Sequence, residues 1–223
     1  EEKCPDETAF VGFRKRLLKH GHSATLFDKT VEILKQRGVI LEEGTCVDAT
    51  IIEASRGRKR SDGTSTRDKT ASYTKKHGTT HHGFKAHIAT DRNGIIKDYR
   101  FDTARVHESR HIDALIADER DSVWADSAYM DARRKERLRE QGIFCGIIER
   151  RGRGQKALTA RQKWHNRLVA GIRAVVEHPF AWMKNSGYRR VRYRGLERNG
   201  IDFALHAIAY NFKRSFSLQQ VMA

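Results

Sequence analysis

Residues 46–52, CVDATII, form the segment that most limits how this chain can fold. β-branched residues dominate the segment and apolar side chains fall on both of its faces, which is typical of a strand buried in the middle of a sheet. Asp48 does not suit such a place, because an ionised carboxylate removed from water costs several kcal/mol unless it is paired or its pKa rises. The segment therefore predicts a central strand of a sheet, with Asp48 on this strand in need of a positively charged or hydrogen-bonding partner.

Helical and extended patterns surround this strand. Apolar residues recur with the 3.6-residue period over residues 8–37, with Gly21 and Gly38 as breaks, and predict helices. Residues 84–90 and 95–101 flank the turn sequence DRNG, which predicts two antiparallel strands joined as a hairpin.

Beyond the hairpin, helices and strands alternate. We expect helices over 107–117 and 131–141, strands over 122–126 and 143–148, a long helix through the 160s and 170s, and a helix over 202–213. A three-strand meander followed by alternating helices and strands predicts an α/β fold, with a mixed sheet and flanking helices.

Residues 55–83 are basic and polar, with too few apolar side chains to pack, so we expect a mobile basic loop there. We divide the chain into a helical segment over 1–43, a central α/β domain over 44–190 that contains this loop, and a basic, helical C-terminal segment over 191–223. The sequence starts without Met, close to the first expected helix, and we expect the N-terminal segment to be truncated.

The charge balance points to an acidic partner. The 223 residues include 44 Lys and Arg against 28 Asp and Glu, a formal net charge of +16, which favours nucleic acid as the partner. No run approaches the ~20 apolar residues of a membrane helix, and no basic-then-apolar leader opens the sequence. The three cysteines form no C-x-x-C pair, so we expect a protein of the reducing cytoplasm without a disulfide framework or zinc ribbon.

Two further acids stand in apolar surroundings. Asp126 ends the run VWA, and Glu177 follows AVV on a helical segment. Acids on two strands and a helix can converge at one end of a sheet, and carboxylates with substrate phosphates suit Mg²⁺. Two such ions can clamp the attacking and leaving oxygens of a phosphoryl transfer. We therefore expect Asp48, Asp126 and Glu177 to bind Mg²⁺, with Mn²⁺ as a substitute.

Arg173, Glu177 and Lys184 are spaced by four and seven residues, which places them on one helical face if the helix continues. The plain alternative is a solvated face with one ion pair. Pro179 favours a kink in this helix, unless it sits in the first turn of a new helical segment.

Basic residues also dominate residues 150–198, where fourteen Lys or Arg stand against two acids. Such one-signed charge predicts salt-sensitive binding to phosphates. Four aromatic residues in this region could stack on unpaired bases, namely Trp164, Trp182, Tyr188 and Tyr193. Core packing is the favoured role for the two tryptophans. The cations that we expect to contact DNA are Arg58, Lys59, Arg60, Lys75, Lys76, Lys85, Arg173, Lys184, Arg192 and Arg194.

Two other kinds of site are disfavoured. Histidines gather at His77, His81, His82 and His87, but a His-based nuclease needs two His around one apolar residue and a nearby Tyr nucleophile. The only His-x-His spacing is HGH at 20–22, where the middle residue is Gly. Tyr129 has no Arg and His constellation around it that would make it a recombinase nucleophile, so we interpret it as a packing or substrate-contact residue.

At this point the sequence resembles the DDE transposases of bacterial insertion sequences, specifically the insertion sequence five group. The matching segments run in order over about residues 5–214: VDATII at 47–52, TKK at 74–76, GFKAH at 83–87, ADSAY at 125–129, VEHPF at 176–180 and RYRGL at 192–196. The resemblance implies an RNase H-like fold, with the DDE catalytic domain over 44–190.

The resemblance also implies a mechanism and a set of residues. The catalytic and metal-binding triad falls on Asp48, Asp126 and Glu177. The signature Y-x2-R-x3-E-x6-K is matched at Arg173, Glu177 and Lys184, whereas Ala170 replaces its Tyr. The implied reaction is metal-dependent hydrolysis at the element ends, followed by attack of the 3′-hydroxyl on target DNA. The implied partner is double-stranded DNA, bound by a homodimer in the bacterial nucleoid.

Two alternatives stay open on the sequence alone. One is a catalytically inactive DNA-binding fragment that keeps the fold and the basic surface. The other is a structure-specific nuclease of the same fold, which would cut branched DNA without joining ends.

Overall fold

A computed structural model describes residues 4–76 and 78–222. Its centre is a mixed six-stranded sheet with the order β2-β3-β1-β5-β6, in which β4 also pairs with β3. The strands are Thr45–Glu53 (β1), Ser72–Lys76 (β2), Thr79–Thr90 (β3), Ile96–Thr103 (β4), Ser122–Ala125 (β5) and Phe144–Ile147 (β6). The α-helices are Glu7–His20 (α1), Ser23–Gln36 (α2), Ile112–Leu115 (α3), Ala132–Glu140 (α4), Ala160–Arg173 (α5), Glu177–Asn185 (α6) and Leu196–Met222 (α7). Three short 3₁₀ turns are Glu108–Arg110 (η1), Ser127–Tyr129 (η2) and Ala174–Val176 (η3).

Strand β1 is the middle of this sheet. It pairs antiparallel with β3 on one side and parallel with β5 on the other, and β5 in turn pairs parallel with β6. The far side of β3 pairs with β2 through its first residues and with β4 through its later ones. The sequence-based prediction of a buried central strand followed by a hairpin and by two strands separated by helices is therefore confirmed.

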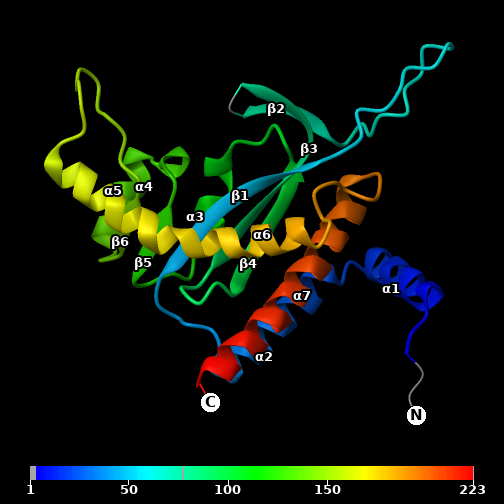
Figure 1. The fold of residues 1–223 in the computed structure, drawn as a ribbon, viewed down its shortest axis with the longest axis horizontal. Helices are drawn as coiled ribbons and strands as arrows, with labels where there is room; N and C mark the ends of the chain where they lie inside the picture. Colours follow the sequence, from blue (N-terminus) through cyan, green and yellow to red (C-terminus); the bar gives the residue numbers. More distant parts are fainter. Residues whose placement is uncertain (1–3, 77, 223) are drawn as a thin grey trace.

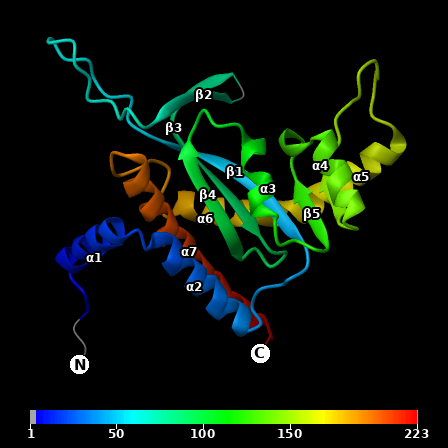
Figure 2. The same ribbon diagram turned by 180° about the vertical axis from the view of Figure 1, so that it is seen from behind.

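Helices cover both faces of the sheet. The line of α5, η3 and α6 crosses one face (Figure 1), whereas α3 and α4 lie on the other (Figure 2). Alternation along β1 divides the core accordingly: Cys46 and Ile52 pack with Val169 and Val176 of the first layer, and Val47 packs in the second.

The N- and C-terminal helices belong to the same core. Helices α2 and α7 lie side by side in both ribbon views, and Phe27 and Phe203 are buried with the sheet residues. Helix α1 projects away from the body. Gly21 ends it in the left-handed conformation (φ 66°), where its N–H caps the carbonyl of Leu17, so the expected break between two helices is confirmed.

The expected basic loop over 55–83 is wrong in its second half. Residues 72–76 and 79–83 form a hairpin of β2 with the start of β3. An outlying hairpin needs few apolar side chains, because its ladder of backbone hydrogen bonds holds it together. The residues before β2 do form a long projection without a helix or a named strand (Figure 1).

Pro179 lies in the first turn of α6, after the η3 turn has interrupted the helical line from α5. This is the position at which a proline costs a helix least, because the first amides have no carbonyl partner within the helix. Elsewhere the expected helix over 107–117 is reduced to η1 and α3, and that over 202–213 is extended into α7.

Within residues 4–76 and 78–222, no helix has both the length and the apolar character needed to cross a membrane.

Candidate active site

Strand register brings Asp48 and Asp126 together. Val47 pairs with Ala125 in the parallel ladder between β1 and β5, and the two aspartates are the next residues in each chain segment. Neighbouring strands lie ~4.8 Å apart, and residues level with each other point to the same face. The two carboxylates therefore emerge side by side on the face that α5 and α6 cover.

Arg173, the last residue of α5, joins Glu177 to this pair. Its Nη1 lies 3.1 Å from Oδ2 of Asp48, and its Nη2 lies 3.0 Å from Oε1 of Glu177. The predicted common face of Arg173 and Glu177 is thus confirmed by a direct contact across one helical turn. Asp48 and Arg173 are about one-fifth exposed, whereas Glu177 is 59% exposed.

The pKa of Asp48 is raised, chiefly because burial in the sheet penalises its charged form. The N–H of Ala49, which donates to Oδ1 at 2.8 Å, and the charges of Arg173 and Lys76 offset part of that increase. A further positive charge at this position, such as a bound cation, would favour the ionised carboxylate.

Tyr129 packs in the second layer of the core, together with Val47 and Ala125. Its ring is fully buried and its hydroxyl has no hydrogen-bond partner within the described part of the chain. Burial raises the pKa of this phenol well above its usual value, and the negative charges of Glu108, Asp48 and Asp126 add to the effect. A buried, protonated phenol is no nucleophile, which agrees with the prediction of a packing role.

The three acids do not close into a single cage. Among the described residues, no group of three His, Cys, Asp or Glu side chains lies close enough to hold a metal ion. The guanidinium of Arg173 stands between Asp48 and Glu177. The donor set is nevertheless chemically suited to Mg²⁺, since it consists of hard carboxylate oxygens, two of them adjacent.

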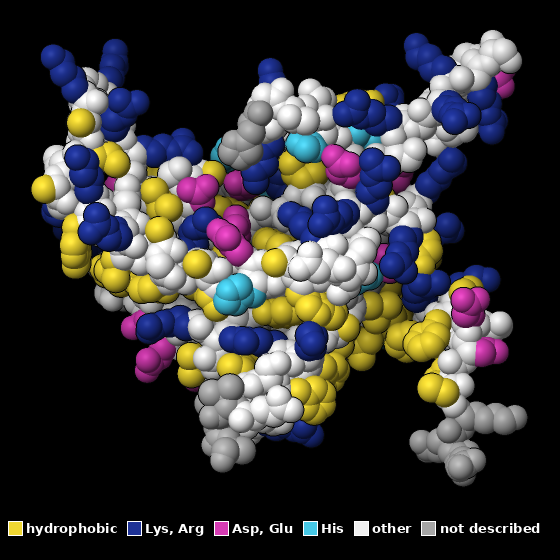
Figure 3. Space-filling model, viewed as in Figure 1, with side chains coloured by type: hydrophobic (Ala, Val, Ile, Leu, Met, Phe, Trp, Pro, Cys, Tyr) yellow, Lys and Arg dark blue, Asp and Glu magenta, His cyan; other side chains and the backbone are white. Residues whose placement is uncertain are grey.

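Cations surround the acids on projecting segments. Space-filling Figure 3 shows Lys and Arg side chains over the projecting loops and the β2–β3 hairpin, with Asp and Glu side chains gathered in the hollow between them. Arg58, Lys59 and Arg60 are exposed in the long loop before β2, and Lys75 and Lys76 are exposed on β2. The expected contacts at these five positions are thus available to a ligand.

Lys184 lines a groove beside the site, together with Lys76, Arg189 and Arg190. The pKa of Lys184 is lowered, first by burial and then by the charges of Lys76 and Arg189. The sequence-based set of expected DNA contacts does not include Arg189 and Arg190 of this groove. The excess of Lys and Arg over residues 150–198 is the sequence feature that could have indicated them.

Arg192 and Arg194 are exposed in the segment between α6 and α7. This segment is tied to the long loop before β2, because the N–H of Gly195 donates to Oδ2 of Asp68 at 2.8 Å. The contact brings two separate basic stretches of the sequence to one side of the molecule.

Lys85 differs from the other expected DNA contacts. Its side chain is only 8% exposed; its Nζ donates to the carbonyl of Val106 at 2.9 Å and lies 3.7 Å from Oε1 of Glu108. Burial lowers its pKa. Lys85 thus ties β3 to the segment before η1 and does not reach out from the surface.

The described histidines of this group take part in no cluster of three metal-ligating side chains. His81 contacts Glu53 at 2.9 Å, whereas His82 and His87 are buried and their ring nitrogens have no partner among the described residues. His77 lies outside the described residues.

The aromatic residues divide between core and surface. Tyr188 is buried and Trp182 packs against the core, and Arg14 lies over the ring of Tyr193 at 4.9 Å. Trp164 is 66% exposed, so the favoured core role is confirmed for Trp182 and is wrong for Trp164.

Comparison with known proteins assigns this arrangement to a family. The family model of the transposase DDE domain matches residues 41–212, which include β1, β5, α6 and the three acids. No solved structure matches the chain. A DDE domain implies an RNase H-like fold, and the mixed sheet agrees with it. The chain therefore belongs to the family of transposases with a DDE domain.

Proposed function

We propose that the chain is a transposase of the insertion sequence five group of bacteria, which cuts a phosphodiester at each end of its element and joins the freed 3′-hydroxyl to target DNA. The observation that carries the proposal is the pairing of Val47 with Ala125, which sets Asp48 beside Asp126, together with the contact of Arg173 to both Asp48 and Glu177.

Asp48, Asp126 and Glu177 are the residues that would hold Mg²⁺ or Mn²⁺. When bound, the cations would supply the positive charge that stabilises the attacking and leaving oxygens of phosphoryl transfer. Asp48 and Asp126 are already adjacent. Glu177 is mostly exposed, so its side chain has room to rotate toward them once Arg173 releases it.

Arg173 and Lys184 are the cations that would position the DNA backbone. Released from the carboxylates, the Arg173 guanidinium offers a planar fork that matches a phosphate. Lys184 holds a point charge in the adjoining groove with Lys76 and Arg189. Ala170, at the Tyr position of the signature, supplies no polar contact to this arrangement.

Double-stranded DNA is the proposed partner, both as the element end and as the target. Phosphates would contact the loop with Arg58, Lys59 and Arg60, the hairpin with Lys75 and Lys76, and the segment with Arg192 and Arg194. We further propose that two copies act together on DNA in the bacterial nucleoid, each contributing one set of acids to one element end.

The test is cleavage and strand transfer of end-bearing DNA in Mg²⁺, comparing the wild type with Asp126→Asn. We expect both reactions to be lost and binding of the same DNA to be kept, since the change removes one charge and little volume. The matched control is Asp131→Asn, because Asp131 caps the N-terminus of α4 and Asn also serves as a cap.

Each alternative has its own outcome in this experiment. A wild type that binds end DNA but neither cuts nor joins it would be a DNA-binding fragment. A wild type that cuts branched DNA without joining ends would be a structure-specific nuclease. Equal activity in Asp126→Asn would contradict the assignment of the triad.

A further inference from the structure

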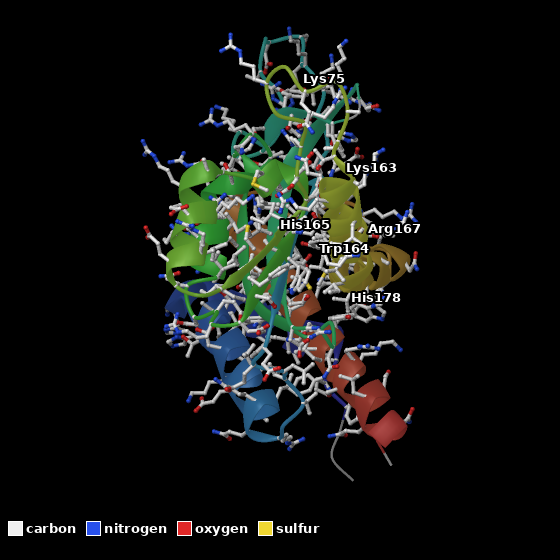
Figure 4. All side chains as sticks on the ribbon, turned by 90° about the vertical axis from the view of Figure 1, so that its left-hand side faces the viewer. Lys75, Lys163, Trp164, His165, Arg167 and His178 are labelled. Atoms are coloured by element: carbon white, nitrogen blue, oxygen red, sulfur yellow. The ribbon has the colours of Figure 1, made fainter. Side chains whose placement is uncertain are left out.

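The outer face of α5 holds a large aromatic ring in water. Trp164 is 66% exposed, and Leu168, one turn further along, is 38% exposed. Figure 4 shows Trp164 on α5 with Lys163, His165 and Arg167 beside it. A bulky apolar side chain exposed to solvent is common when it stands alone, whereas Trp164 is surrounded by cations.

The fold does not need Trp164. The inner face of α5 is formed by other residues: Val169 is fully buried, and Nε2 of His165 lies 3.2 Å from the carbonyl of Ile147. None of the ring–ring or cation–ring contacts of the described residues involves Trp164. Its ring is therefore available to a ligand.

The charge around the ring is of one sign. Arg167 lies three residues beyond Trp164, which places this cation next to the ring on the helix surface, and Lys163 is the exposed residue before Trp164 in the chain. Residues 150–176 contain eight Lys or Arg and no Asp or Glu. An aromatic ring flanked by cations complements a polymer that presents flat rings and phosphates, which is the chemistry of a nucleic acid strand.

An unpaired strand fits this face better than a duplex does. The bases of a duplex are stacked on each other and offer no free ring face, whereas an unpaired base can stack on tryptophan whatever its identity. Trp164 lies nine residues from Arg173, which is ~14 Å along the helix axis and about half a turn around it. The face is therefore separate from the site of the three acids.

We propose that the outer face of α5 binds single-stranded DNA, with Trp164 stacking on a base and with Lys163 and Arg167 contacting its phosphates. The inference rests on the proposed function only in taking DNA as the polymer. On this basis the protein contacts DNA at two places. One is the site of the three acids, and the other is the outer face of α5, which binds an unpaired strand.

The test is binding of a ten-nucleotide oligothymidylate in EDTA. Binding is measured by tryptophan fluorescence and by the anisotropy of a labelled oligonucleotide. The protein has three tryptophans. Trp124 is only 6% exposed and Trp182 packs against the core, so quenching should come mainly from Trp164. We expect Trp164→Leu to lose most of the quenching and about tenfold in affinity, while Trp164→Phe keeps most of the affinity. Binding to a duplex of the same length should change less than twofold.

Phe216→Ala is the matched control, because Phe216 is 63% exposed on α7, and it should leave oligothymidylate binding unchanged. Equal affinity in wild type and Trp164→Leu would overturn the inference. So would an equal loss for duplex and single strand, or a change in sedimentation that shows the ring to be a contact between protein copies. Because the assay needs no cleavage, failure of the proposed reaction would leave its result readable.

Discussion

Arg173 Nη1 lies 3.1 Å from Asp48 Oδ2, although 125 residues separate the two in the chain. The same guanidinium reaches Glu177, so one positive charge serves two carboxylates. Together with the charge of Lys76, this contact offsets part of the cost of keeping Asp48 charged inside the sheet.

Replacing Arg173 should therefore make stability depend on a divalent cation. We expect Arg173→Gln to lose about 1–3 kcal/mol of unfolding free energy in EDTA, because Asp48 and Glu177 lose their shared partner. Mg²⁺ or Mn²⁺ should restore more stability to the variant than to the wild type, since the cation no longer competes with a guanidinium. Thermal melts over a metal titration measure both effects.

Arg161→Gln is the control for that experiment. Arg161 is an exposed residue of the same helix, 3.5 Å from Glu149, and exposed pairs contribute little. A metal response in Arg161→Gln as large as that of Arg173→Gln would show that the effect is not specific to the site.

His87 should make the fold sensitive to acid. It is fully buried next to the His111 ring, and burial, with the charges of His111 and Lys85, lowers its pKa to about 3. In the unfolded chain it takes up a proton below ~6.5. The contribution of neutral His87 to the free energy of unfolding is therefore complete above that pH. It is lost as the pH falls toward 3, at up to ~1.4 kcal/mol per pH unit.

Urea unfolding between pH 7.5 and pH 4.5 would measure this decline. We expect His87→Phe to flatten the curve, because the variant has no proton to bind there. The exposed His178 provides the comparison, and His178→Phe should follow the wild-type curve. A wild type whose stability is constant over this range would contradict the buried, neutral state of His87.

Gly83 should tolerate no side chain. A Cβ at this position would lie 2.2 Å from the carbonyl oxygen of Ile52 on β1, where the neighbour is backbone and cannot move aside. We expect Gly83→Ala to cost about 2–3 kcal/mol. Gly171→Ala is the contrast, because nothing lies within 4 Å of that Cβ and alanine favours the helix by up to ~1 kcal/mol. Melting temperatures should move in opposite directions.

The loop residues 58–60, RKR, should contribute to DNA affinity through charge alone. Changing all three to Ala should lower duplex affinity and reduce the slope of log K against log salt by about 2–3, since each phosphate contact contributes ~0.9. The same number of charges removed from α1, as Lys15, Arg16 and Lys19 to Ala, is the control. Equal slopes for the two triple variants would assign the effect to net charge and not to the loop.

Much of the sheet could be predicted from sequence because its signals are local. The run at 46–52 predicted the central strand, and the DRNG turn predicted the β3–β4 hairpin. The position of Asp48 within that run predicted that it has a partner. The hairpin at 72–83 was missed, because its strands are held by backbone pairing that leaves little apolar pattern in the sequence.

The placement of single side chains was harder to predict. Trp164 and Trp182 look alike in sequence, yet the first is exposed and the second packs on the core. Lys85 looks like the other cations, but its neighbours on the fold enclose it. Both outcomes depend on which helix or turn passes over the residue, and local sequence carries no record of that.

The alignment of Val47 with Ala125 has a consequence for how such a chain can vary. A slip of one residue between β1 and β5 would turn Asp48 toward the opposite layer and would force Val47 out of its own layer. The apolar side chains of the second layer thus fix the strand register that holds the two aspartates together. A substitution among them that shifts this register would abolish activity although all three acids remain.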